Sequence, residues 1–216
     1  MSSINCKCGA ITIAFPQEKP LFAGECNCVD CLGKLCQLAK KGGPEVPVEI
    51  ISYDKSLVLY YAHDKMLVTG HKDTLKFTTV REGSTSTNCI ASCCNTLMVV
   101  DNPIYHQGSG ASGSTDGSGM VMFYETMTPT GVPADMQLRW WIKDIPASKL
   151  ANMPELPAFY LDVSGDFSTM QLPYGGDIGF AAFGVAAMIP ALAGDGQTFA
   201  QLLAECGGTV TVELYN

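Results

Sequence analysis

Charged side chains and long apolar runs are scarce in this chain, and each shortage argues against a class of protein. Only 16% of the 216 residues are Asp, Glu, Lys or Arg, and the formal net charge is −8. Without a basic stripe the chain has little to neutralise a phosphate backbone, so we expect no nucleic-acid partner. The acidic balance argues equally against attraction to an anionic membrane surface.

The sequence also lacks the pattern of a membrane span or a signal peptide. The most apolar stretch, residues 178–193, is interrupted by Gly179, Gly184 and Pro190. The first residues show neither a basic start nor an apolar run. We therefore expect no membrane partner and a cytoplasmic protein, in which thiols stay reduced. Ten cysteines in that compartment favour metal binding over a secreted disulfide scaffold, which is the alternative.

Cysteine is the abundant and informative residue. Eight of the ten cysteines lie in three short clusters: Cys6 and Cys8; Cys26, Cys28 and Cys31; Cys89, Cys93 and Cys94. A C-x-C step cannot easily close on itself as a disulfide, but both sulfurs can turn toward one ion. Zinc is the expected ion, two per chain, because it accepts sulfur ligands without redox chemistry.

The first and third clusters together predict a structural zinc site. Cys6 and Cys8 would supply two ligands, and two of Cys89, Cys93 and Cys94 would supply the others. A structural zinc adds folding free energy on the order of 10 kcal/mol.

The middle cluster, Cys26, Cys28 and Cys31, supplies three ligands without an obvious fourth. Three protein ligands and an open position are typical of catalytic zinc. Three thiolates leave the complex near −1, which weakens zinc as a Lewis acid but suits binding of a thiol or a hemithioacetal oxygen. Alternatively, Cys36 or a histidine closes a second structural site, although Cys36 also fits the apolar face of a helix.

These motifs, in this order over residues 4–102, resemble the glutathione-dependent formaldehyde-activating enzyme family, which includes the centromere protein V group. The resemblance implies an α+β, mostly β fold of the Mss4-like (β-tent) zinc-binding type. It implies a structural zinc on the first and third clusters and a catalytic zinc on the middle one. It also implies carbon–sulfur lyase activity on S-(hydroxymethyl)glutathione.

The chain departs from the family pattern in two motifs. Asn27 stands where the family usually has His, and the late C-x-x-C-G motif is replaced by a Cys93-Cys94 doublet followed by Asn95 and Thr96. Aligning on Thr96 makes Cys94 the best ligand and leaves Cys93 or Cys89 as its partner.

Hydrophobic periodicity independently predicts a β-rich α+β domain with few helices. We expect strands at 11–15, 48–53, 57–61, 66–68, 75–80, 96–100, 120–124, 138–142 and 209–214, helices at 31–41 and 198–206, and a short turn or helix at 146–150. Residues 4–102 would form the zinc-binding core. Residues 103–216 would be a C-terminal extension of the same domain, with a flexible Gly/Ser loop at 108–119.

Two further sets of side chains are candidates for the site. His106 follows a strand and precedes the Gly/Ser loop, so it is the best candidate for a general acid or base. Lys34, Lys40 and Lys41 follow the middle cluster, and they form either a solvated helix face or a binding site for glutathione-like carboxylates.

The sequence therefore predicts a zinc-dependent carbon–sulfur lyase. Its partner would be a small-molecule thiol adduct of an aldehyde or related metabolite, with glutathione as the thiol that the resemblance implies. The alternative is a non-catalytic protein-interaction module with two structural zinc sites. The coordination of the middle cluster separates the two: an open position favours the enzyme, and a fourth protein ligand favours the module.

Overall fold

The computed structural model describes residues 2–106, 119–133, 136, 138–140, 144–153 and 195–214. The predicted loop at 108–119 lies outside the described residues except for Gly119, and so do residues 141 and 142 of the predicted strand at 138–142. The chain has a mixed α and β structure that is mostly sheet, as expected. No described helix has both the length and the apolar character needed to cross a membrane.

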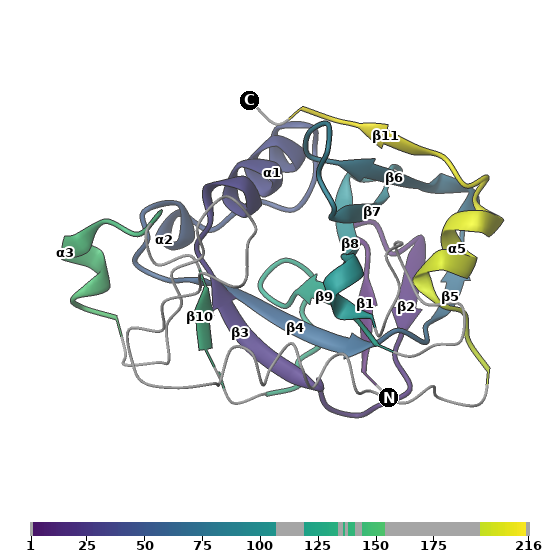
Figure 1. Ribbon diagram of the computed structural model, residues 1–216, viewed down its shortest axis with the longest axis horizontal. Coiled ribbons are helices and arrows are strands. Elements are labelled where there is room, and N and C mark those ends of the chain that lie inside the picture. The colour runs from purple at the N-terminus through teal and green to yellow at the C-terminus, as the bar shows by residue number, and fades with distance from the viewer. Residues whose placement is uncertain are drawn as a thin grey trace.

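Two sheets make up the described part of the fold (Figure 1). The larger sheet has, in spatial order, β10 (Leu138–Trp140), β3 (Phe22–Cys26), β4 (Leu57–His63), β9 (Met120–Tyr124), β8 (Thr96–Asp101), β7 (Thr87–Ala91), β6 (Leu75–Thr79) and β11 (Val210–Val212). The smaller sheet has the order β1 (Ser3–Asn5), β2 (Ile11–Ala14) and β5 (Leu67–Gly70). The helices are α1 (Val29–Lys40), α2 (Val48–Ile51), α3 (Ala147–Leu150) and α5 (Phe199–Glu205), with 3-10 turns η1 (Lys72–Thr74) and η2 (Pro103–Tyr105).

Three strands from the C-terminal half of the chain belong to the large sheet. Strand β9 lies between β4 and β8, where Phe123 is paired with Tyr60 and Met122 with Val100. Strands β10 and β11 add parallel partners at the two edges, beside β3 and β6. Residues 4–102 therefore complete their sheet only with strands that come after position 103.

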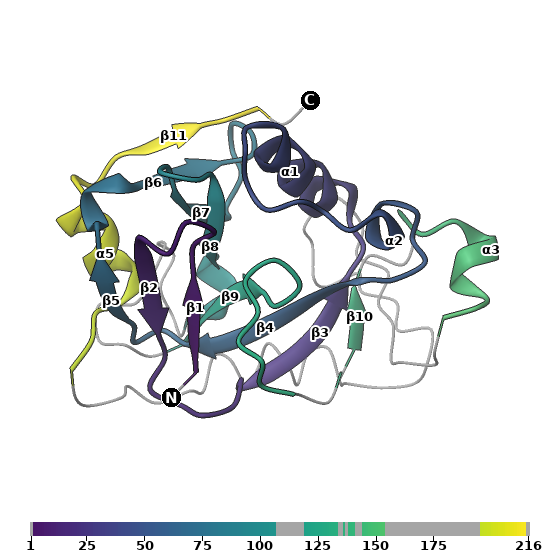
Figure 2. The same cartoon turned by 180° about the vertical axis from the view of Figure 1, so that it is seen from behind.

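The two faces of the large sheet bury separate cores, because successive side chains of a strand point to opposite faces. Along β9, Met120, Met122 and Tyr124 face the core that includes α1, whereas Val121 and Phe123 face the core that includes β1, β2 and α5. Figure 2 shows the β1–β2 hairpin on the side of the molecule opposite α2 and α3. We call these the α1 core and the hairpin core.

Helix α1 starts at the middle cysteine cluster. Cys28 is its N-cap, with its sulfur accepting a hydrogen bond from the Cys31 N–H at 3.2 Å. The helix buries Leu35 and Leu38 in the α1 core, and Lys34 is buried on the same side. The predicted helix at 31–41 is thus confirmed, but Lys34 does not lie on a solvated face.

Helix α5 packs against the hairpin core. Thr198 and Gln201 form a capping box at its start, so its first N–H groups are satisfied. Phe199 and Leu202 are completely buried, and the Phe199 ring meets the edge of the Phe77 ring at 5.5 Å between centroids. This packing confirms the predicted helix at 198–206.

Other sequence predictions need correction. The segment 48–53 is not a strand: it contains the short helix α2, in which only Ile50 is buried while Val48 and Ile51 remain 71% and 47% exposed. A short apolar run is compatible with a strand or with a helix. In the described part of the chain, no strand pairs with this segment. The periodicity also failed to reveal β1, β3 and β7, which are only three to five residues long.

We expect Phe199→Ala to lower the free energy of unfolding by about 3–5 kcal/mol, because it removes a fully buried aromatic side chain between α5 and β6. Urea denaturation followed by circular dichroism would measure the change. Leu67→Ala, at a position that is 46% exposed, serves as the control and should change stability by less than about 0.5 kcal/mol. Equal effects of the two substitutions would contradict this packing.

Candidate metal centres

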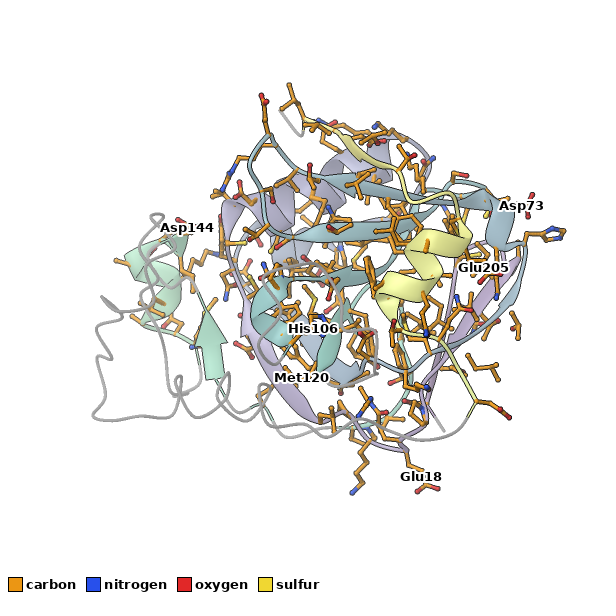
Figure 3. All side chains as sticks on the ribbon, turned by 45° about the vertical axis from the view of Figure 1, so that its right-hand side comes forward. Glu18, Asp73, His106, Met120, Asp144 and Glu205 are labelled. Atoms are coloured by element: carbon orange, nitrogen blue, oxygen red, sulfur yellow. The ribbon has the colours of Figure 1, made fainter. Side chains whose placement is uncertain are left out.

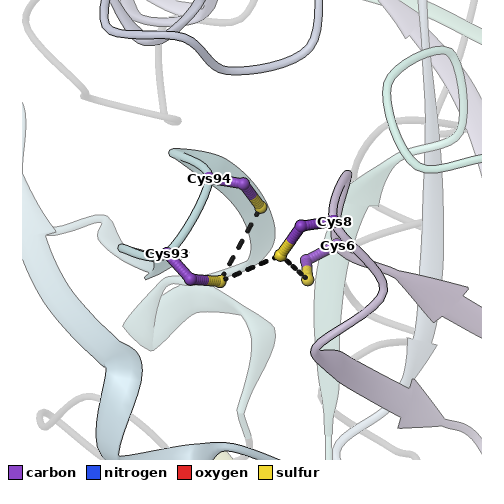
Figure 4. Close-up of side chains that lie close together, drawn as sticks. All are labelled: Cys6, Cys8, Cys93 and Cys94. Carbon is purple, nitrogen blue, oxygen red and sulfur yellow. Dashed lines mark hydrogen bonds between the residues drawn. The ribbon is translucent and has the colours of Figure 1, made fainter.

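The first and third cysteine clusters meet in space. Cys6 and Cys8 lie in the turn between β1 and β2, and Cys93 and Cys94 lie in the turn between β7 and β8 (Figure 4). Sulfur–sulfur distances are 3.5 Å between Cys6 and Cys8, 3.4 Å between Cys8 and Cys93, and 3.8 Å between Cys93 and Cys94. All four sulfurs lie within 4.8 Å of one another, so this four-cysteine group could hold a metal ion.

The geometry of the four-cysteine group fits a tetrahedral site. A zinc–sulfur bond of about 2.3 Å implies sulfur–sulfur edges of about 3.8 Å in a tetrahedron. The observed separations of 3.4–3.8 Å are close to that value. Four sulfur donors are also the set that structural zinc prefers.

The two turns are shaped for this convergence. Gly9 and Asn95 each follow a cysteine pair and have positive φ angles of 77° and 49°, which the chain needs in order to reverse after the ligands. The Ile11 N–H donates to the Cys6 sulfur at 3.3 Å. The Lys7 N–H donates to Thr96 Oγ1 at 3.0 Å, which joins the two hairpins directly.

Cys89, the alternative ligand, is excluded from this group. It lies within β7, opposite Phe77 and Val99, and its side chain is fully buried in the hairpin core. Burial raises the pKa of its thiol well above the usual range, because a thiolate would be poorly solvated there. The Cys93-Cys94 doublet is therefore the second pair of cysteines in the group that could hold an ion.

The middle cluster forms a second group. Cys26 ends β3, Cys28 caps α1 and Cys31 lies in the first turn of α1, and their sulfurs all lie within 4.8 Å of one another. The Cys26 and Cys31 sulfurs are 3.5 Å apart. This three-cysteine group could also hold a metal ion, as predicted.

Among the described residues, no fourth metal-binding side chain joins the three-cysteine group. Cys36 lies farther along α1 and is not part of it. All three histidines are in the described part of the chain, and none of them belongs to either group. The alternative in which Cys36 or a histidine closes the site is therefore not what the structure shows.

The thiols of the three-cysteine group share protons unequally. Hydrogen bonds from Cys26 and Cys28 hold the pKa of Cys31 well below its usual range. Bonds to Cys28 and Cys31, together with burial, raise the pKa of Cys26. The hydrogen bond to Cys26 lowers the pKa of Cys28, but the hydrogen bond to Cys31 and burial outweigh it, so the pKa of Cys28 is also raised. Cys26 and Cys28 therefore hold their protons more tightly than Cys31 does, until a metal displaces them.

Polar side chains from three other elements surround the three-cysteine group. Tyr61 of β4, Tyr105 of η2 and Tyr124 of β9 are all buried in the α1 core with Cys26 and Cys28. Burial and the neighbouring thiolates raise the pKa of the Tyr124 hydroxyl, so it is a neutral donor at physiological pH. Sequence patterns indicated that these strands are buried, but not that their tyrosines meet the cysteines.

The three lysines that were predicted to bind substrate carboxylates lie at different positions along α1. Lys34 lies one turn after Cys31 and lowers the pKa of its thiol by its charge, although hydrogen bonds from Cys26 have a larger effect. Lys40 and Lys41 follow Cys31 by nine and ten residues, at the other end of the helix and about 14–15 Å away along its axis. Both are exposed, and Lys41 forms an ion pair with Glu213 at 3.1 Å. Only Lys34 is therefore placed to act at the three-cysteine group.

His106 is fully buried between two carboxylates. Its Nε2 contacts Asp101 Oδ1, and its Nδ1 is 3.7 Å from Asp64 Oδ2. Figure 3 labels His106 within the described part of the fold. Both ring nitrogens thus face carboxylates, an arrangement that ties the ends of β4 and β8 together. A role for His106 as a general acid or base stays a prediction.

Comparison of the chain with protein-family models, with curated proteins and with solved structures gave no match. The site is therefore interpreted from its own geometry and chemistry.

We expect the native protein to bind two metal ions per chain. Cys94→Ser should reduce this to one, because it removes a ligand of the four-cysteine group, whereas Cys89→Ala and Cys36→Ser should each leave two. Elemental analysis and native mass spectrometry would measure the stoichiometry. Loss of one ion from Cys89→Ala, with two retained by Cys94→Ser, would overturn the ligand assignment.

Metal affinity of the three-cysteine group should fall as pH falls, because each bound metal displaces the protons that the thiols hold. The pKa values of Cys26 and Cys28 are raised, so a metal must displace the protons of these two thiols when it binds. Each displaced proton should raise the dissociation constant about tenfold for each pH unit of acidification. Competition with a chromophoric chelator at several pH values would measure the slope, and a flat profile would contradict it.

Proposed function

We propose that this protein binds two zinc ions and that they have different roles. Thiolate-only ligand sets favour soft or borderline metals, and zinc accepts them without redox chemistry. The four-cysteine group offers a complete tetrahedral set and suits a structural ion. The three-cysteine group offers three protein ligands among the described residues and suits an ion with one exchangeable position.

We further propose that the three-cysteine group is the active site of a carbon–sulfur lyase that acts on the thiol adduct of an aldehyde. The observation that carries this proposal is the difference between the two groups, four ligands in one and three in the other. The motif order over residues 4–102 adds support, since it resembles the glutathione-dependent formaldehyde-activating enzymes. On this proposal the chain is a divergent relative with an Mss4-like (β-tent) fold, and glutathione is the implied thiol.

The proposed reaction is balanced without an oxidant or reductant. A hemithioacetal, R–S–CH(OH)–R′, gives the thiol R–SH and the aldehyde O=CH–R′. The carbon–sulfur bond breaks and its electron pair stays on sulfur, the hydroxyl proton leaves oxygen, and a proton is added to sulfur. Cys26, Cys28 and Cys31 would hold the zinc ion, which would supply Lewis acidity toward a sulfur or oxygen donor.

The chain's own residues prepare this site in three ways. Cys28 fixes the start of α1 as its N-cap and so positions Cys31. Tyr61 and Tyr105, whose rings meet edge to face at 5.3 Å, bury the side of the group that faces the α1 core. The Lys34 ammonium offsets the net negative charge that three thiolates would leave on the site.

A protein-interaction module with two structural zinc sites is the competing function. It requires that the middle site be closed by a fourth protein ligand, and the described residues supply none. The geometry therefore favours the enzyme.

We expect the zinc-loaded protein to accelerate the exchange of formaldehyde with its glutathione adduct, and Cys28→Ser to abolish the acceleration. Serine is itself a preferred N-cap, so this substitution keeps the start of α1 while removing a thiolate. Exchange spectroscopy with isotope-labelled formaldehyde would measure the rate, and circular dichroism would check the fold. Cys36→Ser on the same helix is the matched control and should retain the native rate.

The result that would defeat the proposal is a native protein with two bound zinc ions and no rate above that of buffer with any aldehyde–thiol pair tested. Unfolding of Cys28→Ser together with release of both ions would favour the structural role for this site.

A further inference from the structure

A buried lysine lies against the three-cysteine group. Helix α1 turns Lys34 inward beside Leu35, so that only 4% of the residue is exposed. Lys34 follows Cys31 by three residues, which places both side chains on one face of the helix. A lysine is seldom buried this deeply unless its charge is matched by a partner.

The direct contacts of the Lys34 ammonium are with neutral groups. Its Nζ donates to Asn88 Oδ1 at 2.8 Å and lies 5.3 Å from the centre of the Tyr124 ring. The Asn88 amide donates to the Thr78 carbonyl at 3.0 Å, which holds its oxygen toward the lysine. No carboxylate of the described segments lies within ion-pair distance of Lys34.

The Tyr124 hydroxyl is a second donor at the same place. Tyr124 is completely buried, and the side chain that its hydroxyl approaches is Cys31. This approach lowers the pKa of the Cys31 thiol, after the larger effects of Cys26 and Cys28. Because sulfur is a weak acceptor, the hydroxyl remains able to donate to an oxygen atom that comes close to Cys31.

We propose that Lys34 and Tyr124 form a subsite for an oxygen anion beside the three-cysteine group. The ammonium and the phenolic hydroxyl come from different elements, α1 and β9, and the Lys34 ammonium lies near the Tyr124 ring. Both are strong donors to oxygen, whereas sulfur is a weak acceptor. This inference rests on the proposed function and narrows it: the substrate presents an oxygen that is or becomes negatively charged, as the hydroxyl oxygen of the adduct does when it loses its proton.

The simpler role for Lys34 is general neutralisation of the thiolate charge, with no ligand contact. That role requires no donor from Tyr124, and it predicts equal effects on every anion that approaches the metal. The two roles therefore differ in whether the phenolic hydroxyl matters and whether oxygen and sulfur ligands are distinguished.

Anion binding to the cobalt-substituted protein tests the subsite independently of turnover. Acetate serves as the oxygen anion and ethanethiol as the sulfur ligand, each titrated while the visible absorption of cobalt is followed. We expect Lys34→Met to raise the acetate dissociation constant about tenfold or more and Tyr124→Phe to raise it about three- to tenfold. Tyr124→Phe should leave the ethanethiol constant unchanged, and the exposed Lys40→Met, on the same helix, should leave both constants unchanged.

Equal losses for acetate and ethanethiol in Lys34→Met, with no effect of Tyr124→Phe, would overturn the subsite in favour of charge neutralisation alone. Unchanged acetate binding in both variants would overturn it as well. Tyr124→Phe removes a single oxygen atom and so keeps the test available if Lys34→Met does not fold. Failure of the native protein to hold a second cobalt ion would instead refute the proposed function, so the two failures are distinguishable.

Discussion

The anchoring of helix α1 at both ends is the constraint on which the rest of the structure depends. At its start, Cys28 caps the helix and belongs to the three-cysteine group. At its end, the Lys7 ammonium donates to the carbonyls of Gly42 and Gly43 at 3.0 Å, and Asn95 Nδ2 donates to the Lys41 carbonyl at 2.6 Å. Since Lys7 and Asn95 flank ligands of the four-cysteine group, one helix joins the two groups. An ion in the four-cysteine group would thereby help to hold the helix that carries Cys31.

The end of α1 packs tightly against the β7–β8 turn. A side-chain carbon at Gly43 would lie 2.6 Å from the Asn95 carbonyl oxygen and 2.7 Å from that of Leu38. Both neighbours are backbone atoms. A side chain at position 43 would therefore push the end of α1 away from the β7–β8 turn and break the hydrogen bond between them. The other end of α1 is equally fixed, because its N-cap sulfur is part of a cysteine group and the Val29 N–H donates to Asp144 at 3.1 Å.

Sequence patterns gave the ligands more reliably than they gave the fold. The C-x-C and C-x-C-x-x-C spacings predicted which cysteines lie together within each cluster, because ligands only a few residues apart must stay close whatever the fold around them. The meeting of the first and third clusters was also predicted, but it depends on the packing of two hairpins that are far apart in the chain. The choice between Cys89 and Cys93 needed the register of β7, which turns Cys89 into the hairpin core. Segment 48–53 was wrongly predicted as a strand, because its apolar residues do not reveal whether a second sheet face covers them. The surroundings of the three-cysteine group were not predictable, since Tyr124 reaches Lys34 from more than 80 positions away.

The sequence by itself determined the candidate ligands, their grouping within each short cluster and the β-rich character of the chain, because these follow from local spacing and from alternation along single strands. The tertiary structure brings the first and third clusters together. Only the tertiary structure decided which face of the sheet each cysteine occupies and which end of α1 meets which group. It also decided that Lys34 is buried beside Tyr124 rather than solvated. These features depend on strand order and on β9 entering the sheet between β4 and β8. Such pairings are set by the burial of whole faces against each other, which no short stretch of sequence encodes.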